Sequence, residues 1–78
     1  MRKKQLKLVI TFHTTTDSMA MEKLCKENQA NGRMIPVPRE ISAGCGLAWA
    51  ANPEEKDRLI ELMRSAGLKE EGMQECMV

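Results

Sequence analysis

The stretch Leu6-Lys7-Leu8-Val9-Ile10-Thr11-Phe12 alternates in a way that is typical of a strand with one buried face. Leu6, Leu8, Ile10 and Phe12 share one side of such a strand, so we expect these four side chains to face the core. Helices predicted further along the chain can supply the layer that covers this face.

Immediately after this strand, the run Thr14-Thr15-Thr16-Asp17 offers several residues that can cap the start of a helix. Over the next turns, apolar residues recur at helical spacing and charged residues occupy the other side: Ala20, Met21, Leu24 and Cys25 against Glu22, Lys23, Lys26 and Glu27. Asn31 and Gly32 both tolerate left-handed backbone angles, so we expect the helix to end there.

Two further strand patterns flank a loop. Residues 33–37 predict a short strand, and Pro36 places it at a sheet edge because proline cannot donate to a ladder. Residues 38–45 are predicted to form the loop, and residues 46–51 predict a third strand.

A second helix is predicted to begin at Asn52-Pro53-Glu54-Glu55. Asn52 is expected to cap it, Pro53 suits the first helical position, and the two acids favour the positive end of the helix. Gly67 is expected to end this helix after an apolar stripe made of Leu59, Leu62, Met63 and Ala66. Residues 71–77 predict a last strand.

The predicted order is strand, helix, strand, strand, helix, strand. It fits an α+β fold with the ferredoxin-like βαββαβ arrangement, in which two helices cover one face of a four-stranded antiparallel sheet. The 78 residues are expected to form a single domain, residues 1–78. A chain of this length buries only about 60% of its unfolded surface, so its stability is expected to be marginal.

Charge and hydropathy exclude several classes of partner. The net charge of +1 gives no reason to expect binding to nucleic acid or to a membrane surface. Residues 1–4 resemble the start of a signal peptide, but the apolar run at 8–10 is too short to continue one, and no segment could span a bilayer. We therefore expect a cytoplasmic protein with reduced thiols.

One cysteine stands out by its position, because Cys45 lies between Gly44 and Gly46 in the loop before the third strand. In the predicted topology this strand runs antiparallel beside the first, which places Cys45 near His13 and the N-terminal turn of the first helix. A helix N-terminus favours a thiolate over a thiol, and Arg39 in the same loop could add to this effect. The flanking glycines would leave the sulfur uncovered.

The other two of the three cysteines are expected to lie elsewhere. Cys25 belongs to the core side of the first helix, and Cys76 ends a strand that runs away from the Cys45 edge. A disulfide needs Cα atoms within about 7 Å, so Cys45 is predicted to be solitary.

The cysteines and His13 also allow a metal site, a hydrolase site or a packing role. A zinc site of Cys25, Cys45, Cys76 and His13 is disfavoured because the spacing matches no usual ligand pattern. A cysteine–histidine hydrolase is disfavoured because His13 is the sole imidazole and no acid that would orient it can be named. Cys45 could also simply fill the start of a strand.

Two surface features have both a plain and a functional interpretation. Arg39 and Glu40 are most simply a solvated pair, although they could also contact a partner. The face away from the helices carries Val9, Ala48 and Ala50, which suggests an apolar surface that a homodimer could cover.

The segment Met34–Ser42, followed by Cys45–Ala48, resembles the Se/S carrier protein-like family, a small domain long catalogued without a known function. Supporting likenesses are Thr11–Phe12 with Ala20–Leu24, and Ala66–Leu68 with Glu71–Gly72. This resemblance implies that Cys45 is a carrier cysteine that works beside cysteine desulfurases and selenium-dependent enzymes.

The resulting hypothesis is a relay without a substrate pocket or a resident cofactor. A desulfurase-type donor would present sulfane sulfur or selenium, Cys45 would hold it as a transient persulfide or perselenide, and an acceptor protein would collect it. The residues expected to contact the cargo or the partners are Arg39, Glu40, Ser42, Gly44, Gly46 and His13. The alternative is a non-catalytic interaction module of the same fold, in which Cys45 is incidental.

Overall fold

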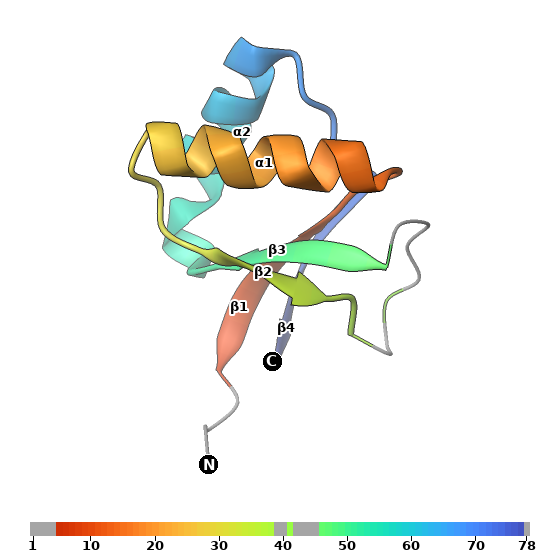
Figure 1. The fold of residues 1–78 in the computed structure, drawn as a ribbon. Coiled ribbons are helices and arrows are strands. Elements are labelled where there is room, and N and C mark those ends of the chain that lie inside the picture. The colour runs from red at the N-terminus through yellow and green to blue at the C-terminus, as the bar shows by residue number, and fades with distance from the viewer. Residues whose placement is uncertain (1–4, 39–40, 42–45, 78) are drawn as a thin grey trace.

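The computed structural model describes residues 5–38, 41 and 46–77. The elements follow in the order β1 (Leu6–Thr11), α1 (Thr15–Glu27), β2 (Arg33–Pro36), β3 (Leu47–Ala51), a 3₁₀ turn (Pro53–Glu55), α2 (Lys56–Ala66) and β4 (Gly72–Met77). Both helices lie on the same side of the sheet (Figure 1). The predicted order of elements is therefore confirmed.

The four strands form one antiparallel sheet in the order β2-β3-β1-β4. The pairing of β1 with β3 runs from Leu8 opposite Ala51 to Thr11 opposite Ala48. On its other side, β1 pairs with the whole of β4. This is the ferredoxin-like topology predicted from the sequence, with the proline-containing strand β2 at an edge, as expected.

The core lies between the sheet and the two helices. Its buried members include three of the four alternating residues of β1 and its extension, the inner residues of both helices, and two residues of β3: Leu8, Ile10, Phe12, Met21, Cys25, Trp49, Ala51, Leu59 and Met63. Leu6, which the alternation also assigned to the core, is 49% exposed. Leu6 lies at the start of β1, opposite Met77 at the end of β4, and Met77 is also exposed. The core therefore does not extend to this end of the sheet.

The opposite face of the sheet does not offer the apolar surface that the sequence suggested. Val9, Ala48 and Ala50 are buried within the chain itself. Val9 and Ala50 pair with each other, and on their outer sides Gln74 lies opposite Val9 and Arg33 lies opposite Ala50. These three residues are therefore not an exposed apolar patch, and the homodimer stays a prediction.

Helix α1 begins as expected and ends early. The Thr14 hydroxyl accepts a hydrogen bond from the Asp17 amide at 3.1 Å, which caps the first turn. The helix ends at Glu27 rather than at residues 31–32, because Gln29 takes a left-handed conformation with φ of 56°. The Ala30 amide then donates to the Cys25 carbonyl at 2.8 Å, which satisfies one of the last carbonyls of the helix.

Gly32, which was expected to end α1, instead packs against Trp49. Its φ is 133°, and a Cβ at this position would lie 2.3 Å from Trp49 Nε1 and 2.8 Å from the Ala50 carbonyl oxygen. Only a glycine permits this approach of the backbone to the indole edge.

Asn52 is the N-cap residue of the helical segment and Pro53 follows it at the first position, as predicted, but the Asn52 side chain makes no capping hydrogen bond. Its Oδ1 accepts a hydrogen bond from Lys7 Nζ at 2.8 Å, and the helical segment starts with a 3₁₀ turn at Pro53. At the other end, Gly67 takes a left-handed conformation with φ of 72°, as predicted for the residue that ends α2.

Candidate functional site

One edge of the sheet brings together segments that are far apart in the chain. Thr11, at the end of β1, pairs with Ala48 of β3 and with Gly72 at the start of β4. His13 and Gly46 each lie two residues beyond the Thr11–Ala48 pair, and Glu71 directly precedes Gly72. Helix α1 starts just after His13, with Thr14 as its cap. We call this edge, defined by His13, Thr14, Gly46 and Glu71, the rim.

The expectation that the end of β1, the start of α1 and the start of β3 share one edge is therefore confirmed. Cys45 directly precedes Gly46 in the chain, but it lies outside the described residues. The same holds for four other residues that the sequence assigned to the site: Arg39, Glu40, Ser42 and Gly44. What was expected of these five residues stays a prediction.

One backbone hydrogen bond joins the two residues that flank the segment 38–45, and a second lies within its first residues. The Val37 amide donates to the Gly46 carbonyl at 3.0 Å, and the Ile41 amide donates to the Pro38 carbonyl at 3.0 Å. Gly46 has φ of 74°, and a Cβ at that position would meet no atom of the described residues within 4 Å, apart from its chain neighbours. Glycine is therefore favoured here by its backbone angle.

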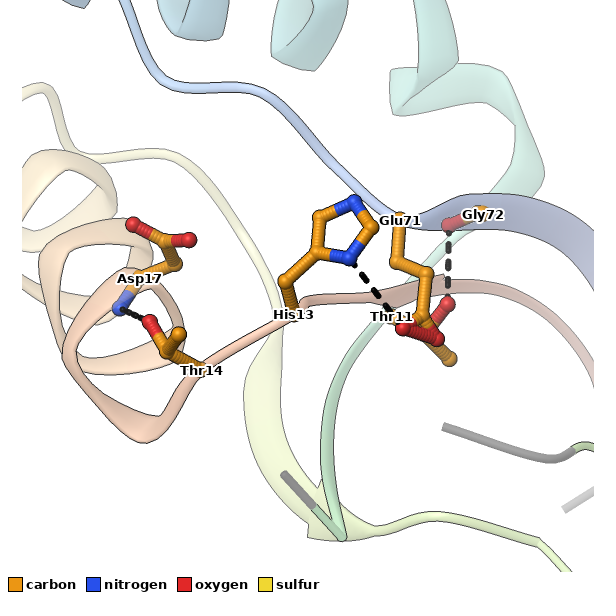
Figure 2. A network of polar contacts seen from close by, with 6 residues as sticks. All are labelled: Thr11, His13, Thr14, Asp17, Glu71 and Gly72. Atoms are coloured by element: carbon orange, nitrogen blue, oxygen red, sulfur yellow. Dashed lines mark hydrogen bonds and ion pairs between the residues drawn. The ribbon is translucent and has the colours of Figure 1, made fainter. Parts of the chain in front are cut away.

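His13 has an acidic partner at the rim. Its Nδ1 lies 3.5 Å from Glu71 Oε2, and Figure 2 shows the two side chains pointing toward each other. The Glu71 amide donates to the Thr11 carbonyl at 2.7 Å, which ties the backbone of Glu71 to the end of β1. The His13 side chain is 64% exposed, so the pair orients an accessible imidazole and adds at most about 1 kcal/mol of stability.

Glu71 is the residue that the sequence analysis missed, since no acid was named for His13. The two residues come from opposite ends of the chain, and no local spacing connects them. The signal that could have found Glu71 is topological. Once the last strand pairs antiparallel with the first, the start of the last strand meets the end of the first.

The N-terminus of α1 contributes the remaining polar feature of the rim. Free amide groups and the positive end of the helix dipole favour an anion there, although Asp17 in the first turn offsets part of this field. Together with an oriented imidazole, this arrangement can stabilise a thiolate or persulfide anion and can exchange a proton with it.

A shallow hollow of about 220 Å³ adjoins the rim. Its described lining comes from β1, the start of β4 and the loop before β3: Val9, Thr11, Ile41, Glu71, Gly72, Met73 and Gln74. The Thr11 hydroxyl donates to the Gly72 carbonyl at 3.3 Å, so this buried polar side chain is already satisfied.

The other two cysteines lie away from the rim, as predicted. Cys25 is 1% exposed and belongs to the core. Cys76 lies opposite Lys7, near the start of β1, whereas the rim lies beyond Thr11 at its end. Four residues of strand correspond to about 13 Å.

Burial raises the pKa of Cys25 to about 11 from an ordinary value of 9.0, against a smaller opposing effect of Arg58. The folded protein therefore keeps a proton that the unfolded chain releases. The protonated Cys25 thiol therefore contributes its whole share of the free energy of unfolding below pH 9. This contribution should be lost as the pH rises toward 11, by up to about 3 kcal/mol. Urea unfolding at several pH values would measure this, with a Cys25→Ala variant as the control. Equal pH dependence in both proteins would contradict the prediction.

The described part of the chain shows neither a cluster of metal ligands nor a membrane-spanning helix. Within residues 5–38, 41 and 46–77, no group of three or more His, Cys, Asp or Glu side chains could hold a metal ion. The three described members of the weighed zinc set, His13, Cys25 and Cys76, lie at the rim, in the core and at the far end of β4. Neither helix of this part has the length and apolar character needed to cross a bilayer.

Comparison with known proteins gives one family. The model of the family described as "Putative Se/S carrier protein-like" matches residues 7–75. No curated protein and no solved structure matches the chain significantly. The match extends from β1 into β4 and covers most of the sequence. The chain therefore belongs to the Se/S carrier protein-like family.

Proposed function

We propose that this protein carries sulfur or selenium, and that it holds the atom on Cys45 between a donor and an acceptor protein. The observation that carries the proposal is the family match over residues 7–75. The rim adds a physical rationale, because Cys45 directly precedes a rim residue, Gly46, in the chain.

The transfer needs no net oxidation or reduction. The Cys45 thiolate attacks the terminal sulfur of a donor persulfide, R–S–SH, so that a new S–S bond forms and the donor leaves as the thiolate R–S⁻. An acceptor thiolate then attacks the terminal sulfur of Cys45–S–SH and releases the Cys45 thiolate. A perselenide donor, R–S–SeH, would react in the same way through its terminal selenium.

The rim can assist both steps. The helix N-terminus favours the thiolate that attacks and the thiolate that leaves. The imidazole of His13, oriented by Glu71, can take up or return the proton of the terminal S–H group. We assign His13 as the group that moves this proton and Glu71 as its positioning residue.

The burial of Cys25 and the remote place of Cys76 support the same proposal. A second thiol near a persulfide attacks it and discharges it as a disulfide, with release of hydrogen sulfide. Cys25 is buried and its pKa is raised to about 11, so at neutral pH it is a poor attacking group. Cys76 lies about four residues of strand, or roughly 13 Å, from the end of β1.

The test is to load the protein and locate the added atom. The purified protein is incubated with a cysteine desulfurase and cysteine, alkylated without reduction and analysed by peptide mass spectrometry. We expect one added sulfur atom on the Cys45 peptide and none on the Cys25 peptide, while a parallel incubation with selenocysteine tests selenium. Glutathione that is added afterwards should remove the added atom, because the glutathione thiolate acts as an acceptor.

A Cys45 peptide that stays unmodified while the desulfurase turns over would contradict the carrier proposal. Loading of Cys76 in place of Cys45 would contradict it as well. The chain would then be better described as an interaction module of ferredoxin-like fold, which is the alternative considered from the sequence.

A further inference from the structure

A second hollow lies at the end of the sheet opposite the rim, where β1 begins and β3 ends. Its volume is about 170 Å³, and the described residues that line it are Lys7, Gly32, Arg33, Ala50, Ala51 and Asn52. None of them belongs to the rim, and the proposed carrier chemistry uses none of them.

Two basic residues that line the hollow belong to the two strands that flank β3. Arg33 of β2 lies opposite Ala50 of β3, and Lys7 belongs to β1 on the other side of β3. Adjacent strands are about 4.8 Å apart, so the backbones of β1 and β2 are separated by roughly 10 Å. Ala50 pairs with Val9 on β1, so Lys7 lies two residues further along that strand, beside Asn52. Both long side chains line the same hollow and can reach one group bound in it.

Lys7 is held in place before any ligand arrives. Its side chain is half-buried, and its Nζ donates to Asn52 Oδ1 at 2.8 Å. An ammonium group has three donors, so two remain for a ligand, and the Asn52 amide nitrogen carries two more. Arg33 is exposed and presents a planar fork of donors that matches the geometry of carboxylate and phosphate. Donors ordered in advance lose less freedom on binding.

The charged side chains that line the described part of the hollow are all positive. Its described lining contains Lys7 and Arg33 and no carboxylate. Glu55 lies nearby in the chain, but its Oε1 accepts a hydrogen bond from Asn31 Nδ2 at 3.0 Å. Two cations without a matching acid attract an anion from solution.

We propose that this hollow, which we call the basic hollow, binds one oxyanion group, a phosphate or a carboxylate. Arg33 binds it through two parallel hydrogen bonds, Lys7 through its ammonium group, and Asn52 through its amide. The inference is independent of the carrier function, because it rests on the far end of the sheet.

The experiment is an NMR titration of the ¹⁵N-labelled protein with inorganic phosphate and, separately, with acetate, at an ionic strength kept constant with sodium chloride. We expect saturable shifts of the backbone amides of residues 7, 32–33 and 50–52 with at least one of the two anions. The anion that binds more tightly identifies the source of the oxyanion. Chloride alone should produce no saturable shift.

Arg33→Gln and Lys7→Gln should each weaken binding about tenfold, since a hydrogen bond to a charged group is lost in each case. Lys26→Gln is the matched control, because it removes the same charge from the exposed surface of α1 and should leave the affinity unchanged. Arg33 is exposed, so its variant is expected to fold even if Lys7→Gln does not.

Shifts that grow linearly with either anion, or that are equally large in Arg33→Gln, would overturn the proposal. Equal weakening by Lys26→Gln would do so too, because it would mean that only net charge matters. Loading of Cys45 with sulfur should be the same in wild type and Arg33→Gln, so failure of the anion proposal leaves the carrier proposal standing, and the reverse also holds.

Discussion

A Cys45→Ser variant should take up no sulfur from a cysteine desulfurase and should deliver none to glutathione. A serine hydroxyl has nearly the same volume as a thiol, but it neither ionises near neutral pH nor forms a persulfide. The expected change is therefore complete loss rather than a reduced rate. The measurement is the sulfur released by glutathione after incubation with the desulfurase and removal of free sulfide.

The matched control is Cys76→Ser, which makes the same substitution at a half-buried cysteine of β4, at the end of β1 away from the rim. It should load and discharge as the wild type does. Both variants should unfold at nearly the same urea concentration as the wild type. If Cys45→Ser still delivers sulfur, or if Cys76→Ser abolishes delivery, the assignment of the carrier residue is wrong.

Gly32→Ala should destabilise the fold by about 3 kcal/mol or more. The added Cβ would lie 2.3 Å from Trp49 Nε1 and 2.8 Å from a backbone oxygen, and φ of 133° is strained for any residue with a side chain. The indole cannot withdraw easily because Trp49 is buried in the core. Urea unfolding measures the loss, which is a large share of the stability expected for a chain of this size.

Gly67→Ala is the control for this substitution, because φ is also positive there, at 72°, whereas the added Cβ meets no described residue within 4 Å other than its chain neighbours. Only the backbone strain applies, and the cost should be about 1–2 kcal/mol. The packing argument fails if the two variants lose the same free energy of unfolding.

The fold could be predicted from local patterns because these patterns agreed with one another. Leu8, Ile10 and Phe12 of the alternating stretch, the threonine cap and the glycine at position 67 all kept their roles in the structure. The errors arose where a tertiary contact competed with a local signal. The Asn52 side chain accepts a hydrogen bond from Lys7 instead of bonding to the first turn of the helix, and Gly32 packs against Trp49 instead of ending α1.

The candidate site could be predicted only in part. Sequence and topology were enough to bring His13, the start of α1 and Gly46 to one edge of the sheet. The partner of His13 could not be read from spacing, because Glu71 reaches it through the pairing of the first strand with the last. The basic hollow was missed for the same reason, since Lys7 and Arg33 line it from two strands that are separated by β3.

The hydrogen bond between the Val37 amide and the Gly46 carbonyl allows the segment between them to vary in length. It joins the two ends of the segment 38–45 at the sheet, so insertions within this segment leave the strand register intact. Doubling the length of a flexible loop costs only roughly 0.6 kcal/mol of closure entropy. A change in the length of this segment should therefore carry little penalty to folding.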